Sequence, residues 1–222
     1  MIARSLDDQN NKKIYKSRSH MDRIDKAKVF IDAGFLSKVS QHLGSGHYLR
    51  YNLVRFAKNI TGKEELVFKG LNFYNAPPHQ SQPPTNEDRK RKEDYDVFLT
   101  KLSRCGDVKI RQGRCRKIRI NGELKYTQKG VDTLLTMDLM ELAMNNEKIG
   151  TVILIASDTD FVPIVKHLIK IGMKVILYTY FERKRKSKFS TSNYLLQSVS
   201  CYRHLKKSDF DECPLINDPS DT

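Results

Sequence analysis

Hydrophobic and polar positions follow two patterns that take turns along the chain. Short apolar runs rich in β-branched residues predict strands, and continuous runs of this kind are typical of strands buried on both faces. These runs span 28–32, 66–74, 108–111, 151–157 and 174–180. Between them, apolar residues recur at helical spacing. The predicted helices cover 49–60, 95–102, 131–145, 161–171 and 191–199. This alternation, with short connections, predicts one α/β domain with a mostly parallel sheet and helices on both faces.

A β-hairpin is predicted between the third strand and the helix that begins at 131. Residues 116–120 and 123–127 flank the pair Asn121-Gly122. Asn-Gly readily supplies the two positive φ angles of a type I′ turn. We therefore expect the α/β domain to carry an added antiparallel hairpin.

The two ends of the chain differ in charge from the segment between them. Residues 1–25 are polar and basic without a hydrophobic period, which predicts a flexible N-terminal arm. Residues 208–222 contain five acidic residues and no Lys or Arg, which predicts an acidic C-terminal tail. The domain itself is expected to span 26–207.

The composition adds a strong positive charge. The 222 residues hold 40 Lys and Arg against 26 Asp and Glu, so the formal net charge is +14. An anionic partner is expected, and nucleic acid is the first choice because phosphate binding is largely electrostatic. An anionic membrane surface and structural RNA are alternatives that charge alone does not separate.

Basic residues gather in three runs, at 89–92, 109–119 and 183–188. A run of this kind is often only a solvated face, but three of them suggest a rim that grips phosphate. The predicted nucleic-acid contacts are Lys109, Arg111, Arg114, Arg116, Lys117, Arg119, Lys129, Arg183, Lys184, Arg185 and Lys186.

Other classes of protein are not supported by the sequence. No apolar run approaches the ~18 residues of a membrane span, and the first residues lack the apolar core of a secretory signal. The four cysteines form no CxxC pair, and the six histidines show no HxxxH or HExxH spacing. We expect reduced thiols in a cytoplasmic protein, and any metal site must then be built from carboxylates.

Five acidic residues occupy notable positions in this pattern. Asp32 ends the first strand, and Asp158 with Asp160 follows the strand at 151–157. Asp138 lies inside the apolar helix, and Asp132 begins that helix. Each has a simple structural alternative: Asp32 in a turn, and Asp132 or Asp160 as a helix cap. Asp138 is different, because a carboxylate among leucines is expected to be buried and to need a cation, a donor or a metal.

Taken together, these acids are expected to meet beyond the carboxyl ends of parallel strands, where sites form in such sheets. Like charges 4 Å apart repel by ~4 kcal/mol at an effective dielectric constant of 20. A hard divalent cation, Mg²⁺ or Mn²⁺, would relieve this repulsion. In a strongly basic protein, such a site suggests phosphodiester chemistry.

Four segments in this order resemble the NYN domain, a branch of the PIN-like nuclease superfamily, and in particular its LabA-like members. They are VFIDAGFL (29–36), KGVDTLLTMDL (129–139), IASDTDFVPIV (155–165) and GMKVILY (172–178). The resemblance extends over roughly 27–205 and implies a PIN-like three-layer α/β/α sandwich. One departure is Phe35, where many members have Asn.

The resemblance implies a metal-dependent endoribonuclease that hydrolyses RNA phosphodiester bonds at an acidic cluster. Carried over by motif, Asp32, Asp138 and Asp158 would ligate Mg²⁺ or Mn²⁺. Asp160 would ligate the metal or orient a water, and Asp132 would support the cluster. No organic cofactor is expected. PIN-like domains often pair, so the resemblance leaves room for a homodimer.

Two other functions remain open at this point. One is an RNA-binding PIN-like module that does not cut. The other is a metal-dependent DNA nuclease or phosphatase that uses the same acids, which fold analogy alone does not exclude.

Overall fold

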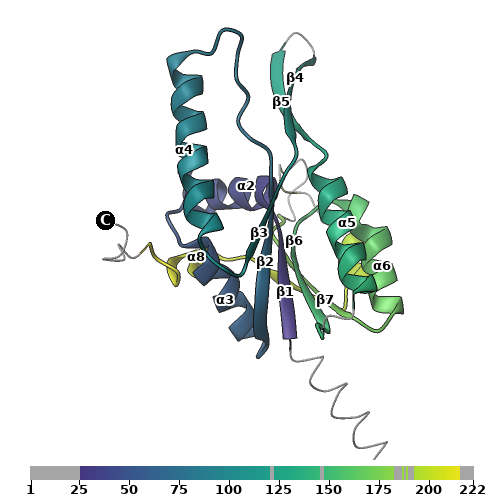
Figure 1. The fold of residues 1–222 in the computed structure, drawn as a ribbon. Helices are drawn as coiled ribbons and strands as arrows, with labels where there is room; N and C mark the ends of the chain where they lie inside the picture. Colours follow the sequence, from purple (N-terminus) through teal and green to yellow (C-terminus); the bar gives the residue numbers. More distant parts are fainter. Residues whose placement is uncertain are drawn as a thin grey trace, which may run out of the picture.

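A single parallel sheet forms the centre of the protein. The computed structural model describes residues 26–120, 123–145, 148–182, 187, 189 and 193–215. Within them, six parallel strands lie in the order β3-β2-β1-β6-β7-β8 (Figure 1). Their bounds are β1 (Lys26–Asp32), β2 (Val67–Asn75), β3 (Val108–Gln112), β6 (Thr151–Ile155), β7 (Lys174–Thr179) and β8 (Cys201–His204).

The strand order creates a switch point between β1 and β6. The chain runs from β1 outward to β2 and β3, and then crosses to β6 on the other side of β1. In the register, Ile31 of β1 lies beside Ile155 of β6. The residues that follow the two strands therefore reach the same edge, where ligands bind in sheets of this kind.

Helices cover both faces of the sheet. One face carries α2 (Ala33–Leu43), α3 (Leu53–Lys63), the end of α4 (Asn86–Ser103) and α8 (Lys207–Asp211). The other carries α5 (Val131–Met144), α6 (Val162–Lys170) and α7 (Asn193–Ser198), with a 3₁₀ turn at Thr159–Phe161. Alternate residues of β1 feed the two cores: Val29 and Ile31 pack into the first and Phe30 into the second. The predicted α/β/α arrangement is confirmed.

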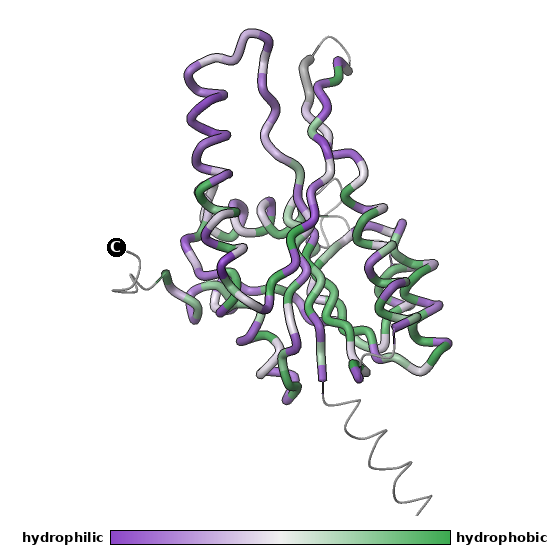
Figure 2. The backbone as a smooth tube through the Cα atoms, in the orientation of Figure 1, coloured by the Kyte–Doolittle hydropathy of each residue, from purple (hydrophilic) through white to green (hydrophobic). Residues whose placement is uncertain are grey.

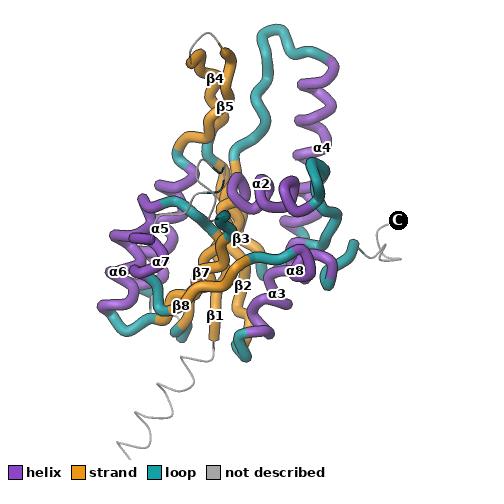
Figure 3. Tube along the Cα trace, turned by 180° about the vertical axis from the view of Figure 1, so that it is seen from behind, coloured by secondary structure: helices purple, strands orange, loops and turns teal. Residues whose placement is uncertain are grey.

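Two projections extend beyond the carboxyl edge of the sheet (Figures 1 and 3). One is the predicted hairpin, built from β4 (Arg114–Ile120) and antiparallel β5 (Glu123–Lys129). The other is the first half of α4 with the loop that leads into it. Figure 2 shows that this half of α4 is hydrophilic, in contrast to the hydrophobic sheet. Exposed basic residues of the hairpin, among them Arg116 and Lys117, therefore lie beyond this edge of the sheet (Figure 1).

Helices α4 and α2 differ from the sequence-based expectation, and a polar side chain caps the first turn of each. Helix α4 begins nine residues earlier than predicted, at Asn86, where Thr85 and Asp88 form a capping box. Helix α2 was not predicted, and Asp32 caps it by accepting a hydrogen bond from the backbone N–H of Phe35.

The predicted boundary between domain and tail at 207 is wrong. Helix α8 returns to the domain, where Phe210 is only 1% exposed and stacks on Phe56. Asp209 is also buried and pairs with Lys63 at 2.8 Å. These contacts bury apolar surface that a tail would leave in water. The predicted N-terminal arm, residues 1–25, lies outside the described residues.

No helix in the described part of the chain is long and apolar enough to cross a membrane.

Candidate functional site

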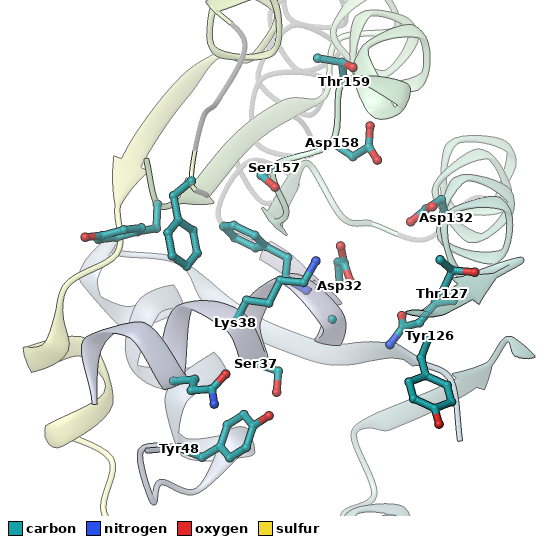
Figure 4. A pocket seen from close by; sticks show the side chains of 16 residues that line it. Asp32, Ser37, Lys38, Tyr48, Tyr126, Thr127, Asp132, Ser157, Asp158 and Thr159 are labelled. Carbon is teal, nitrogen blue, oxygen red and sulfur yellow. Dashed lines mark hydrogen bonds between the residues drawn. The ribbon is translucent and has the colours of Figure 1, made fainter. Parts of the chain in front are cut away.

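A pocket of about 920 Å³ opens at the switch point, and three of the predicted acids line it. Asp32, Asp132 and Asp158 come from three different elements, and Figure 4 shows their side chains around one space. The sequence-based expectation that these three meet at the carboxyl edge of the sheet therefore agrees with the structure.

Asp32 is placed by the junction between β1 and α2. Its Oδ1 accepts a hydrogen bond of 3.2 Å from the backbone N–H of Phe35. Gly34, two residues after Asp32, has no side chain. A Cβ at this position would lie 3.1 Å from the side-chain oxygen of Gln128. The missing side chain lets the base of the hairpin approach Asp32 closely.

Asp158 caps the 3₁₀ turn that follows β6. One of its oxygens accepts a hydrogen bond of 2.9 Å from the backbone N–H of Asp160. The side chain of Asp160 is exposed and does not line the pocket. The predicted role of Asp160 as a direct metal ligand thus has less support from the structure than that of Asp158.

Asp132 lies in the first turn of α5, directly after the hairpin. Gly130 adopts a left-handed conformation with φ of 81°, and this lets the chain turn from β5 into the helix. A negative side chain in the first turn of a helix interacts favourably with its dipole. The KGVD segment (129–132) therefore positions the side chain of Asp132 at the pocket.

The pocket acids repel one another. Burial, with a further contribution from the charge of Asp132, raises the pKa of Asp32 to about 6, against backbone hydrogen bonds that lower it. The pKa of Asp132 is raised as well, first by burial and then by Asp158 and Asp160. Asp32, Asp132, Asp158 and Asp160 thus form one electrostatically connected group, even though Asp160 lies at its margin.

Asp138 lies apart from this group, although the sequence predicted that it ligates the metal with Asp32 and Asp158. Its carboxylate is 3% exposed and points from α5 toward β2 and β3. Tyr74 Oη donates a hydrogen bond of 2.8 Å to Oδ2, and Arg111 Nη2 lies 3.1 Å from Oδ1. Lys109 Nζ lies 3.3 Å from the same oxygen.

The expected burial of Asp138 is therefore correct, but cations and a hydroxyl meet its need for partners. An unpaired carboxylate inside a protein costs several kcal/mol, and these three groups offset that cost. The strand register explains the placement, since residues 109 and 111 of β3 lie beside Asn72 and Tyr74 of β2, under α5.

Lys109 and Arg111 are consequently engaged by the protein itself. Both pair with Asp138, and Lys109 also lies 3.5 Å from Glu141, while their side chains remain 44% and 34% exposed; their contact with nucleic acid stays a prediction. Five other predicted contacts are exposed on the hairpin: Arg114, Arg116, Lys117, Arg119 and Lys129. Arg183, Lys184, Arg185 and Lys186 lie outside the described residues.

Several residues that line the pocket were missed from the sequence. Lys38 on α2 extends toward Asp32 (Figure 4) and lowers the pKa of that carboxyl by its charge, although less than burial raises it. Tyr48 and Tyr126 stand on different sides of the pocket and are 62% and 52% exposed. Lys38 lies six residues after Asp32 on helix α2, so it could have been identified only if that helix had been predicted.

The carboxylates of the pocket are suitable ligands for a hard divalent cation, although they lie too far apart in this structure to bind one ion together. In the described residues, no three His, Cys, Asp or Glu side chains are close enough to hold a metal ion. However, carboxylate oxygens are the ligands that Mg²⁺ and Mn²⁺ prefer. Burial is the main cause of the raised pKa values of Asp32 and Asp132, and neighbouring carboxylates raise them further, so a bound cation would favour the charged forms.

Comparison with known proteins agrees with the parallel α/β fold. The family model of the NYN domain matches residues 26–199, so the chain belongs to the NYN domain family. This is a family of PIN-like nucleases. The narrower LabA-like assignment stays a prediction.

One solved structure with a similar fold is a protein of unknown function from Vibrio parahaemolyticus. It has a TM-score of 0.52 and 17% identity, and the match covers 85% of this chain and 97% of that protein. No curated protein gives a match to this sequence.

Proposed function

We propose that this protein is a metal-dependent endoribonuclease. The observation that carries the proposal is the pocket at the switch point, where Asp32, Asp132 and Asp158 converge from separate elements and repel one another. Asp138 provides the contrast, because the fold supplies it with two cations and a hydroxyl. Within the described residues, no ion pair of that kind neutralises the pocket acids, so their charge is available for a ligand.

Asp32, Asp132 and Asp158 would hold Mg²⁺ or Mn²⁺. When bound, such an ion stabilises negative charge on the phosphate and lowers the pKa of a coordinated water. Because the three carboxylates are not yet within a common ligand distance, we expect them to draw together on binding.

The protein's own groups would position the substrate. Lys38 stands beside Asp32 and can pair with a phosphate oxygen. The exposed cations of the hairpin, from Arg114 to Lys129, can bind phosphates on either side of the cut.

A cleavage assay tests the proposal. Single-stranded RNA, duplex RNA, tRNA and single-stranded DNA would be incubated with the protein in Mn²⁺, Mg²⁺ or EDTA. Replacing an outer-shell partner of a metal already costs about 10- to 100-fold, so Asp32→Asn or Asp158→Asn should lose more than ~100-fold. Asp211→Asn, on the far helix α8, is the matched control and should cut RNA like the native protein. Cutting in EDTA, or unchanged cutting by Asp158→Asn, would contradict the site.

The spacing of the acids supports one alternative, an RNA-binding module that does not cut. The lack of a preassembled metal cluster in the described residues is what a pure binder would show. Binding of RNA without cleavage by the native protein, in either metal, would favour this alternative. Metal-dependent cutting of DNA or release of phosphate would instead favour a DNA nuclease or a phosphatase built on the same acids.

A further inference from the structure

A second pocket lies beside the acidic one, between the hairpin and the loop that leads from β2 to α4. It measures about 280 Å³ and is lined by Ala76, Pro77, Pro78 and His79 from the loop. Cys115 and Tyr126 of the hairpin and Arg91 of α4 complete it. Tyr126, Thr127 and Gln128 line both pockets, so the side pocket adjoins the acidic one.

The walls of the side pocket are flat and mostly apolar. The rings of His79 and Tyr126 meet at 5.1 Å between centroids and 48° between planes. Pro77 and Pro78 add two rigid rings. Tyr126 remains 52% exposed, so much of its ring is open to a ligand. Flat, apolar walls of this type suit a nucleobase, which presents a π face whatever its identity.

Polar groups at the edges of the pocket can meet the edge of a base. The guanidinium of Arg91 is held at 2.6 Å by Asp88, whose side chain is 4% exposed. His79 Nδ1 and Thr127 Oγ1 are buried and have no hydrogen-bond partner among the described residues. Leaving such atoms unpaired carries a free-energy cost of about 1–3 kcal/mol each. Because these two atoms expose almost no surface, Arg91, whose side chain is 51% exposed, is a polar group at this pocket that a base can reach.

The hairpin supplies cations next to the open ring. Lys117 lies directly opposite Tyr126 in the antiparallel register, so both side chains are on the same face of the hairpin. An ammonium group beside a stacking aromatic side chain is the arrangement that single-stranded nucleic acid requires, with bases stacked and phosphates paired.

The size of the pocket limits what enters it. Ligand sites usually start at ~300 Å³, so about 280 Å³ suits one small planar group. A base inside a duplex is covered by its neighbours and its partner, and it could enter only after being extruded, at a cost of a few kcal/mol. An unpaired base needs no such step.

We propose that the side pocket binds one unpaired nucleobase of an RNA whose neighbouring phosphate lies at the acidic pocket. This inference rests on the proposed function and specifies its substrate class: RNA that is single-stranded at the cut site. The aromatic ring of Tyr126 stacks on the base, and Lys117 pairs with a phosphate beside it.

Binding of a fluorescent RNA tests the inference without any need for cleavage. Aminopurine, an adenine analogue whose emission falls on stacking, would be placed at successive positions of a short unpaired RNA. The protein would carry Asp32→Asn, and EDTA would be present so that the RNA stays intact. We expect quenching at one position, and its loss with Tyr126→Ala.

The affinities give a second readout. Base stacking on an aromatic ring is worth about 1–3 kcal/mol, so Tyr126→Ala should weaken binding about 5- to 150-fold. Tyr126→Phe keeps the ring and should bind nearly as well as the parent. Tyr202→Ala removes an exposed Tyr from β8, at the opposite edge of the sheet, and should have no effect. Thermal unfolding of each variant would verify that it is folded.

The outcomes separate this inference from the proposed function. Equal affinities of Tyr126→Ala and Tyr202→Ala, or a duplex that competes as well as the single strand, would overturn the base pocket. If the native protein cuts RNA but no position is quenched, only the base pocket fails. If quenching and the Tyr126 effect occur but no cleavage is found, the base pocket stands and the nuclease proposal fails.

Discussion

The buried carboxylate of Asp138 and the carboxylates of the acidic pocket have different surroundings in this fold. Asp138, near the middle of α5, is buried against Tyr74, Lys109 and Arg111. Asp132, six residues earlier on the same helix, lines an open pocket with Asp32 and Asp158. The six-residue separation turns the two side chains by about 120° around the helix, so they serve different surfaces.

The difference shows how a fold divides structural from functional charge. The charge of Asp138 is balanced inside the protein, and its removal would leave two cations without their partner. The charges in the pocket are not balanced by ion pairs within the described residues. Besides burial, Asp132 raises the pKa of Asp32, and Asp158 raises that of Asp132. The first group stabilises the packing of α5, whereas the second lowers stability unless a ligand binds.

Asp138→Ala should have the largest effect on stability. Breaking a buried ion pair by removing one partner costs about 3–5 kcal/mol, because Arg111 would remain near a cavity without this counter-charge and Lys109 would keep only Glu141. The free energy of unfolding would be measured in urea. Cleavage per folded molecule should change little compared with Asp32→Asn. A stability equal to that of the native protein would remove the distinction between the two groups.

The pH dependence of stability should reveal Asp32. Its pKa is raised from 3.8 to about 6, so the folded state holds a proton that the unfolded state has released. Between about pH 4 and pH 6 the folded state binds more protons, and stability therefore falls as pH rises. Asp32 contributes a loss of up to about 3 kcal/mol, complete above pH 6. Asp32→Asn should flatten this part of the curve, while Asp211→Asn should not. An identical slope in the Asp32 variant would contradict the raised pKa of this buried carboxyl.

Metal binding should produce the smallest of these effects. At ten times its dissociation constant, Mn²⁺ bound only to the folded state adds ~1.4 kcal/mol. For a domain of this size that is a rise of about 3–6 °C in Tm. The rise should disappear in Asp32→Asn and persist in Asp211→Asn. Equal shifts in both variants would place the ion elsewhere.

The sequence predicted most of the elements of this fold. Strands β1, β6 and β7 coincide with continuous apolar runs, because strands buried on both faces need such residues, whereas edge strand β8 was not predicted. The hairpin follows from Asn121-Gly122, whose conformational preference is local. Helix α8 was missed because its short polar sequence gives no periodic signal, and its place depends on Phe210 packing against Phe56.

The candidate site was predicted in part. Asp32 and Asp158 end adjacent parallel strands, so their meeting followed from the predicted sheet. The pairing of Asp138 with Arg111 depends on the register of β3 beside β2 and on which face of α5 covers them. Neither this register nor this helix face can be read from a local segment of the sequence.

By itself, the sequence determined the alternation of strands and helices, the hairpin, the positive charge and the acids at the strand ends. These features depend on local patterns of hydrophobicity, turn chemistry and charge. Only the tertiary structure decided which acids share a pocket, which cations are already paired, and that a flat side pocket lies between the hairpin and the loop before α4. Those outcomes depend on side chains from distant segments, and their distances are set by sheet register and helix packing.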